Sequence, residues 1–168
     1  MSGRVFLLGD DIDTDQLAPG QYMRGGLDML AAHCLESARP DFAGSVKPGD
    51  VIVAGKNFGM GSSREQAAEA LKHLGLAGVV AKSFAGIFYR NALNLGLPVL
   101  VGDNLDGIYD GDSVALDPVA GELRLTDTNK TVRLEPLPDN LKPMLADGGL
   151  VPHLKKRFAA ERAKEAGA

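Results

Sequence analysis

The segment Gly55-Lys-Asn-Phe-Gly-Met-Gly-Ser-Ser-Arg-Glu65 is the most informative stretch of this 168-residue chain. It follows an apolar run, Val51–Ala54, that predicts a buried strand, and it leads into a helical pattern over Arg64–Leu74. Gly59 and Gly61 allow the backbone to come close to a ligand. A strand, a glycine-rich loop and a helix in this order are typical of α/β proteins.

Two hydroxyls and a guanidinium, from Ser62, Ser63 and Arg64, stand where the helix is expected to begin. A helix N-terminus presents unpaired N–H groups and a partial positive charge. Arginine can hold a carboxylate or phosphate through two parallel hydrogen bonds. The pattern therefore predicts a receptor for a small anion. The structural alternative is that Ser62 or Ser63 caps the helix, with Glu65 completing a capping box from Ser62.

The flanking sequence alternates strand and helix patterns, which predicts an α/β layer with parallel strands. Strands are expected at residues 4–8, 51–54, 78–84 and 98–101, helices at 27–37, 64–74 and 86–95, and loops at 10–26 and 40–50. After Gly102, nearly alternating segments at 112–117, 122–126 and 131–135 predict an antiparallel meander. Residues 150–166 predict a charged helix. With no repeat or linker, residues 1–168 are expected to form a single domain.

Composition excludes several classes of function. The net charge of -4 argues against a general nucleic-acid binder. No apolar run approaches the roughly 20 residues that a membrane span needs. The N-terminal segment reaches Asp10 and Asp11 too early for a signal peptide, so a cytoplasmic location is expected.

The chain has a single cysteine, Cys34, and three dispersed histidines, His33, His73 and His153. One thiol cannot hold an iron–sulfur cluster, which needs three or four thiolates, and the histidines lack ligand spacing. No metal site formed by this chain alone is expected, and Cys34 is expected on the inner face of a helix.

Three motifs together resemble the small subunit of the two-subunit aconitase-like hydro-lyases, isopropylmalate dehydratase and homoaconitase. Asp13-Thr-Asp-Gln-Leu-Ala-Pro-Gly-Gln-Tyr-Met-Arg24 is similar to an Asp-Thr-Asp loop followed by a substrate-specificity loop. Gly55–Glu65 is similar to the Asn-Phe-Gly-x-Gly-Ser-Ser-Arg-Glu signature, and Val80–Asn91 to a third block. The resemblance covers the chain from about Leu8 to Gly102.

The resemblance implies the fold of the aconitase C-terminal domain: an α/β, three-layer swivelling β/β/α domain with a mixed sheet plus an antiparallel meander. It also implies a partner, a large subunit that holds a [4Fe-4S] cluster, in a heterodimer or heterotetramer. The implied substrate is a di- or tricarboxylic acid of the malate type, with no nucleic acid and no membrane involved. The main expectation is 3-isopropylmalate dehydratase of leucine biosynthesis. The alternatives are homoaconitase and a dimethylmalate-type dehydratase.

The resemblance also implies roles for individual residues. Ser62 matches a catalytic serine that acts as an alkoxide base, and Arg64 matches an arginine that binds a substrate carboxylate. Ser63 and Gly61 are expected to contribute to substrate binding. Proton abstraction next to a carboxylate requires a positioned base and a positive field, which a serine and an arginine at a helix start can provide.

Substrate specificity is expected to depend on Tyr22, Met23 and Arg24, which match the loop where family members distinguish substrates. An apolar side chain at the third position suits an isopropyl group. Arg24 could instead pair with an additional carboxylate, as in homoaconitate, or it could point outward. The residues leave these possibilities open.

Several polar residues near these motifs have more than one interpretation. Asp13 and Asp15 could form an acid/base or metal site, but carboxylates repel a polyanionic substrate, so a structural or supporting role is favoured. Thr14 is a neutral donor between them. Lys82, at the end of a predicted strand, is either a contributor to the positive field or a solvated lysine.

Two other classes of function compete with an enzyme subunit. A phosphate- or nucleotide-binding module is compatible with the order of strand, glycine loop and helix. However, the segment lacks the lysine of a P-loop and the third glycine of a dinucleotide fingerprint. The other class is a scaffold that kept the fold and lost the chemistry; Ser62 and Arg64 argue against it.

Overall fold

The structure is a computed structural model that describes residues 2–167. Its seven strands are β1 (Gly3–Leu7), β2 (Val51–Ala54), β3 (Gly78–Ala81), β4 (Val99–Val101), β5 (Ser113–Asp117), β6 (Glu122–Leu125) and β7 (Lys130–Arg133). The helices are α1 (Thr14–Leu17), the 3₁₀ helix η1 (Gly20–Gly25), α2 (Leu27–Ala32), α3 (Phe42–Ser45), α4 (Glu65–His73), α5 (Gly86–Asn94), α6 (Lys142–Ala146) and α7 (Leu150–Ala166).

The strands follow the order β4-β3-β2-β1-β5-β6-β7. Strands β1 to β4 are parallel to one another, whereas β5, β6 and β7 form an antiparallel meander whose first strand, β5, pairs antiparallel with β1. Within residues 2–167, the pairs Gly3 with Val114 and Arg4 with Ser113 join the two parts through β1 and β5. The expected mixed sheet with a meander is confirmed.

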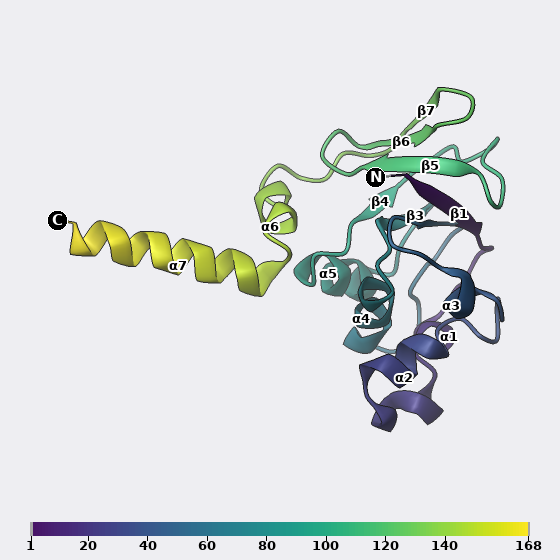
Figure 1. The fold of residues 1–168 in the computed structure, drawn as a ribbon, viewed down its shortest axis with the longest axis horizontal. Helices are drawn as coiled ribbons and strands as arrows, with labels where there is room; N and C mark the ends of the chain where they lie inside the picture. Colours follow the sequence, from purple (N-terminus) through teal and green to yellow (C-terminus); the bar gives the residue numbers. More distant parts are fainter. Residues whose placement is uncertain (1, 168) are drawn as a thin grey trace.

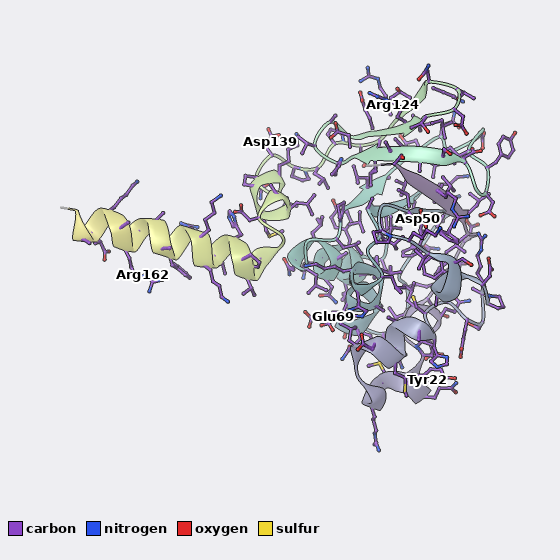
Figure 2. All side chains as sticks on the ribbon, viewed as in Figure 1. Tyr22, Asp50, Glu69, Arg124, Asp139 and Arg162 are labelled. Atoms are coloured by element: carbon purple, nitrogen blue, oxygen red, sulfur yellow. The ribbon has the colours of Figure 1, made fainter. Side chains whose placement is uncertain are left out.

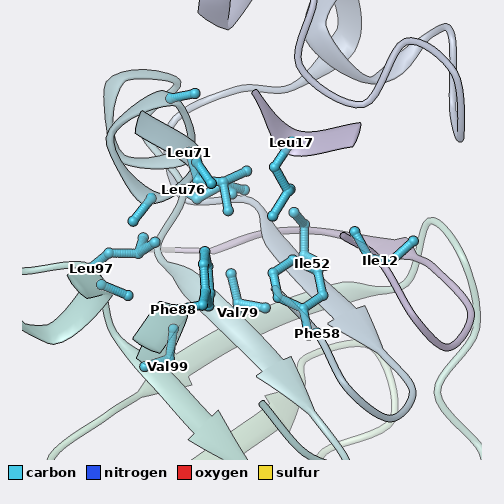
Figure 3. Close-up of a cluster of buried hydrophobic side chains, with 14 of the residues drawn as sticks. Ile12, Leu17, Ile52, Phe58, Leu71, Leu76, Val79, Phe88, Leu97 and Val99 are labelled. Carbon is cyan, nitrogen blue, oxygen red and sulfur yellow. The ribbon is translucent and has the colours of Figure 1, made fainter. Parts of the chain in front are cut away.

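The two faces of the parallel strands belong to different cores. In β2 every residue is buried: Ile52 and Ala54 face the helices, whereas Val51 and Val53 join Val114 and other meander residues. This follows from the period of two in a strand, and strands covered on both faces read as continuous apolar runs. The result is the expected three-layer β/β/α arrangement (Figure 1), and Figure 3 shows part of the helix-side core.

The structure corrects several expected boundaries. Residues 10–26 are not only loop, because they contain α1 and η1, and residues 40–50 contain α3. The helix expected at 27–37 ends at Ala32: Cys34 and Leu35 are buried through turns, and Leu35 has a φ of 61° that no helix allows. The strand expected at 78–84 ends at Ala81. The short helix α6 was not expected.

The expected C-terminal helix is confirmed as α7, which points away from the layers in Figure 1. No residue of α7 is buried, and Val151 and Phe158 are exposed. Among residues 2–167, no helix is both long and apolar enough to cross a membrane.

Candidate active site

The loop that follows β2 is fixed by its phenylalanine and by two glycines. Phe58 is fully buried, and the centroid of its ring lies 5.3 Å from that of Phe88. Its backbone forms an isolated parallel β-bridge with Phe84. Gly59 and Gly61 have φ angles of 84° and 106°, which favour glycine. A Cβ atom at Gly59 would lie 2.2 Å from the Phe88 ring. The inner side of the loop is therefore packed against the core, and the residues that follow, Gly61 to Ser63, are exposed.

Ser62 lies at the outer end of this loop, and its side chain is exposed. Its Oγ atom is 3.2 Å from the Oγ1 atom of Thr14, which is only 3% exposed. The Thr14 N–H donates to the carbonyl of Met60, so α1 and the glycine loop are joined at this point. A buried, fixed hydroxyl therefore stands next to a solvent-accessible one.

Arg64 reaches across to the same segment. Its Nη1 atom lies 2.7 Å from Oδ1 of Asp15 and donates to the carbonyl of Ala18 at 3.1 Å. The hydrogen bond from Arg64 lowers the pKa of Asp15, and a backbone hydrogen bond from Gly20 adds to this effect. Within residues 2–167, the hydrogen bonds of this guanidinium use Nη1 alone, which leaves the Nη2 and Nε edge available to a carboxylate.

Ser62 does not cap helix α4. The helix begins at Glu65, its N-cap residue is Arg64, and no side-chain hydrogen bond closes this end. The capping box expected between Ser62 and Glu65 as the structural alternative is therefore wrong. The hydroxyl of Ser62 is therefore not used in a helix cap, and its hydrogen-bond contact within residues 2–167 is with Thr14.

Asp13 acts as the N-cap of α1. Its carboxylate accepts from the N–H of Gln16, and the Gln16 side chain accepts from the Asp13 N–H, which completes a capping box. The backbone of Asp13 also forms an isolated parallel β-bridge with Met60. The two carboxylates of this motif thus face different tasks: Asp13 holds the short helix, whereas Asp15 holds Arg64.

The segment Tyr22–Arg24, which the sequence predicts to select the substrate and which we call the specificity segment, lies in η1, next to this group in the sequence. Tyr22 and Met23 are half-buried and pack against the helix-side core, whereas Arg24 is exposed. Ser63 and Gly61 are exposed beside Ser62. Lys82 is exposed too, but it lines a separate hollow of about 390 Å³ with Asp10 and Tyr109, and neither Ser62 nor Arg64 lines that hollow.

Sequence reasoning missed one partner at this site, the backbone carbonyl of Ala18, and it did not foresee the pairing of Asp15 with Arg64. These contacts join residues 46 and 49 positions apart. No residue type or spacing signals them, since both segments had to be placed at the same edge of the sheet first.

The residues of this chain do not fit an iron–sulfur cluster. Cys34 is buried, and this burial raises the pKa of its thiol to about 12, which disfavours the thiolate that a metal requires. In the part of the chain that the structure describes, no three His, Cys, Asp or Glu residues are grouped to hold a metal ion.

Comparison with known proteins then places the chain. The model of the aconitase C-terminal domain matches residues 37–103. The chain is 51% identical over 155 residues to the methanogen homoaconitase small subunit of Methanothermobacter thermautotrophicus, covering 92% of this chain and 90% of that protein. The chain belongs to the small subunits of the aconitase-like hydro-lyases. Such a subunit implies a large-subunit partner.

Two further relatives agree with this assignment. The 3-isopropylmalate dehydratase small subunit 1 of Thermotoga maritima is 51% identical over 156 residues, covering 92% of this chain and 94% of that protein. A crystal structure of 3-isopropylmalate dehydratase from Methanocaldococcus jannaschii superimposes with a TM-score of 0.90 at 48% identity, covering 97% of this chain and 98% of that one. The fold and the hydro-lyase class expected from the sequence are confirmed.

Proposed function

We propose that this chain, with a large subunit, dehydrates and rehydrates a malate-type acid, and that the acid is 3-isopropylmalate. The observation that carries the proposal is the pair formed by an exposed Ser62 hydroxyl and an Arg64 guanidinium with a free edge, in a chain about half identical to 3-isopropylmalate dehydratase small subunits. A cytoplasmic location stays a prediction, which fractionation of the producing cells tests.

The reaction requires a proton to leave a carbon next to a carboxylate. Arg64 binds that carboxylate through its free edge and stabilises the charge that develops on it. Ser62, as the alkoxide, accepts the proton on Oγ. A serine is a weak acid, so this anion requires nearby donors; the Thr14 hydroxyl at 3.2 Å is one, and the Arg64 guanidinium supplies positive charge.

The departing hydroxyl needs a group that this chain does not supply. Because its single thiol is buried and held as the neutral form, the [4Fe-4S] cluster implied by the family is assigned to the partner subunit. The small subunit then contributes the base, the carboxylate site and the specificity segment.

A second candidate substrate is homoaconitate. Arg24 is exposed in the specificity segment, where a cation suits an additional carboxylate better than an isopropyl group. The homoaconitase small subunit that is 51% identical over 155 residues supports this candidate equally well. A dimethylmalate-type acid is a further member of the same class.

The test is a substrate panel on the chain reconstituted anaerobically with the cluster-bearing large subunit of the same organism. We expect turnover of 3-isopropylmalate, with homoaconitate and dimethylmalate as the competing outcomes. Ser62→Ala should remove turnover while the two subunits still co-elute; Ser63→Ala, the adjacent hydroxyl, should retain measurable turnover. Full activity of Ser62→Ala refutes its role as the base. Nucleotide binding by the chain alone, without hydratase activity, refutes the enzyme assignment.

A further inference from the structure

The 3₁₀ helix η1, which contains the specificity segment, has few anchors of its own. None of its six residues is buried, and its N-cap residue, Pro19, provides no side-chain hydrogen bond. A 3₁₀ helix also has poorer hydrogen-bond geometry than an α-helix. The position of Met23 and Arg24 must therefore be fixed by contacts from outside the segment.

The main aromatic contact of η1 is between Tyr22 and His33. The two rings are stacked, with centroids 3.6 Å apart and planes inclined by 6°. Figure 2 labels Tyr22 on the part of the molecule that carries α2. This close and nearly parallel contact limits the positions that the Tyr22 ring can take while it stays packed on the imidazole.

His33 itself stands on a fixed platform. It is the C-cap residue of α2, and the residues on both sides in the sequence are anchored: Ala31 and Cys34 are buried, and the N–H of Leu35 donates to the carbonyl of Gln16. The platform is thus tied to α1, the helix that carries Thr14 and Asp15. The hydrogen bond between Leu35 and Gln16 thus connects the segment that carries His33 to the helix that contacts Ser62 and Arg64.

The orientation of the imidazole is also determined. Nδ1 of His33 lies 2.7 Å from Oε2 of Glu36, so the ring donates to a carboxylate through this nitrogen. A histidine that donates to a carboxylate has its tautomer and ring plane set by that bond. The Glu36 contact therefore presents the flat face of His33 to Tyr22.

We propose that His33, oriented by Glu36, is a positioning residue for substrate selection. By holding the Tyr22 ring it keeps η1, and with it Met23 and Arg24, at the distance from Ser62 and Arg64 that the substrate requires. His33 does not touch the reacting atoms. The effect on substrate rests on the proposed function, whereas the effect on the segment itself does not.

The first test needs only the isolated chain. Arg24 is an exposed trypsin site, and cleavage after it reports how often η1 leaves its position. We expect His33→Ala to raise the cleavage rate at this bond by about twofold to about tenfold, the range of one aromatic stacking contact. His33→Phe retains a ring and should restore most of the protection.

A matched control is available in His153. Its Nδ1 atom also lies 2.7 Å from a carboxylate, that of Asp147, and its side chain is similarly half-exposed, but it lies in α7. His153→Ala should leave cleavage after Arg24 unchanged. Wild-type cleavage of His33→Ala, or an equal increase in His153→Ala, overturns the proposal. Urea midpoints of all variants separate local release from global unfolding.

The second test uses the reconstituted enzyme. His33→Ala should raise KM by a factor similar to the increase in cleavage and leave kcat within about twofold, because the base and Arg64 are untouched. An unchanged KM overturns the positioning role, whether or not kcat falls. If the wild-type pair turns over none of the acids in the panel, the proposed function fails instead, and the cleavage comparison still decides whether His33 holds the segment.

Discussion

The Nη1 atom of Arg64 lies 2.7 Å from Oδ1 of Asp15, and the same nitrogen donates to the carbonyl of Ala18. The carboxylate therefore orients the guanidinium, and the opposite edge remains open. Because the hydrogen bond from Arg64 lowers the pKa of Asp15, this carboxyl stays ionised throughout the neutral range. Pre-orientation of this kind reduces the ordering that substrate binding must impose.

Arg64→Lys should lower kcat/KM by about tenfold to about a hundredfold, since a hydrogen bond to a charged group contributes about 1.5–3 kcal/mol. A lysine can keep the pair with Asp15 or bind the substrate carboxylate, but its single ammonium cannot present the planar fork. Steady-state kinetics of the reconstituted enzyme measure the change. Arg90→Lys, on the exposed surface of α5, is the matched control and should be silent. Wild-type kinetics of Arg64→Lys would contradict the assigned carboxylate contact.

Thr14→Val should lower kcat by about tenfold or more, because the substitution keeps the shape of a buried side chain and removes the donor next to Ser62. Thr14→Ser retains the hydroxyl and should retain most of the activity. The pH profile of kcat provides the second readout, since loss of a donor raises the pKa of the Ser62 hydroxyl and shifts the rising limb of the profile to higher pH. Equal activity of the valine and serine variants would show that the Thr14 hydroxyl is dispensable.

Arg24→Val should change the ratio of kcat/KM between homoaconitate and 3-isopropylmalate by at least about tenfold toward the alkyl-substituted acid. The change removes a cation that suits a carboxylate and introduces an apolar surface that suits an isopropyl group. Arg124→Val is the control, since Arg124 lies on the meander, well separated from Tyr22 in Figure 2. An unchanged ratio means that Arg24 points away from the substrate.

Acid should destabilise the fold through Asp110. Both oxygens of Asp110 accept hydrogen bonds from Arg39, at 2.5 and 2.9 Å, and one also accepts from the N–H of Leu7. The Arg39 hydrogen bond lowers the pKa of Asp110 below its ordinary 3.8. A carboxyl whose pKa is lower in the folded state stabilises the fold above its unfolded pKa, and this contribution is lost as the pH falls through the folded pKa.

Urea unfolding at neutral pH and at pH values below 4 measures this contribution. Asp110→Asn should lower the free energy of unfolding at neutral pH and show a smaller further loss in acid than the wild type. The side chain of Asp110 is 49% exposed, so solvent screening keeps the effect modest. Asp127→Asn, at an exposed loop position, should reproduce the wild-type pH dependence. An Asp110→Asn curve parallel to the wild type would contradict this account.

The long elements could be predicted from sequence because their patterns repeat. The runs of β2 and β3 and the helical spacing in α4 and α5 span enough residues to define a period, and Gly75 and Gly96 end those helices with φ angles of 84° and 83°. The single-turn elements could not be predicted in this way. Helix α1 forms because Asp13 and Gln16 cap each other, and four residues are too few for periodicity.

By itself, the sequence determined the layers, the ends of the main helices, and the residue types at the site: a serine, an arginine and glycines after a buried strand. Only the tertiary structure decided that Thr14 meets Ser62 across 48 positions and that Asp15 meets Arg64 across 49. The physical reason is that the carboxyl ends of the parallel strands β1 and β2 lie at one edge of the sheet, so the segments that follow them come together there. The spacing of residues along the chain does not indicate which of these distant segments come into contact.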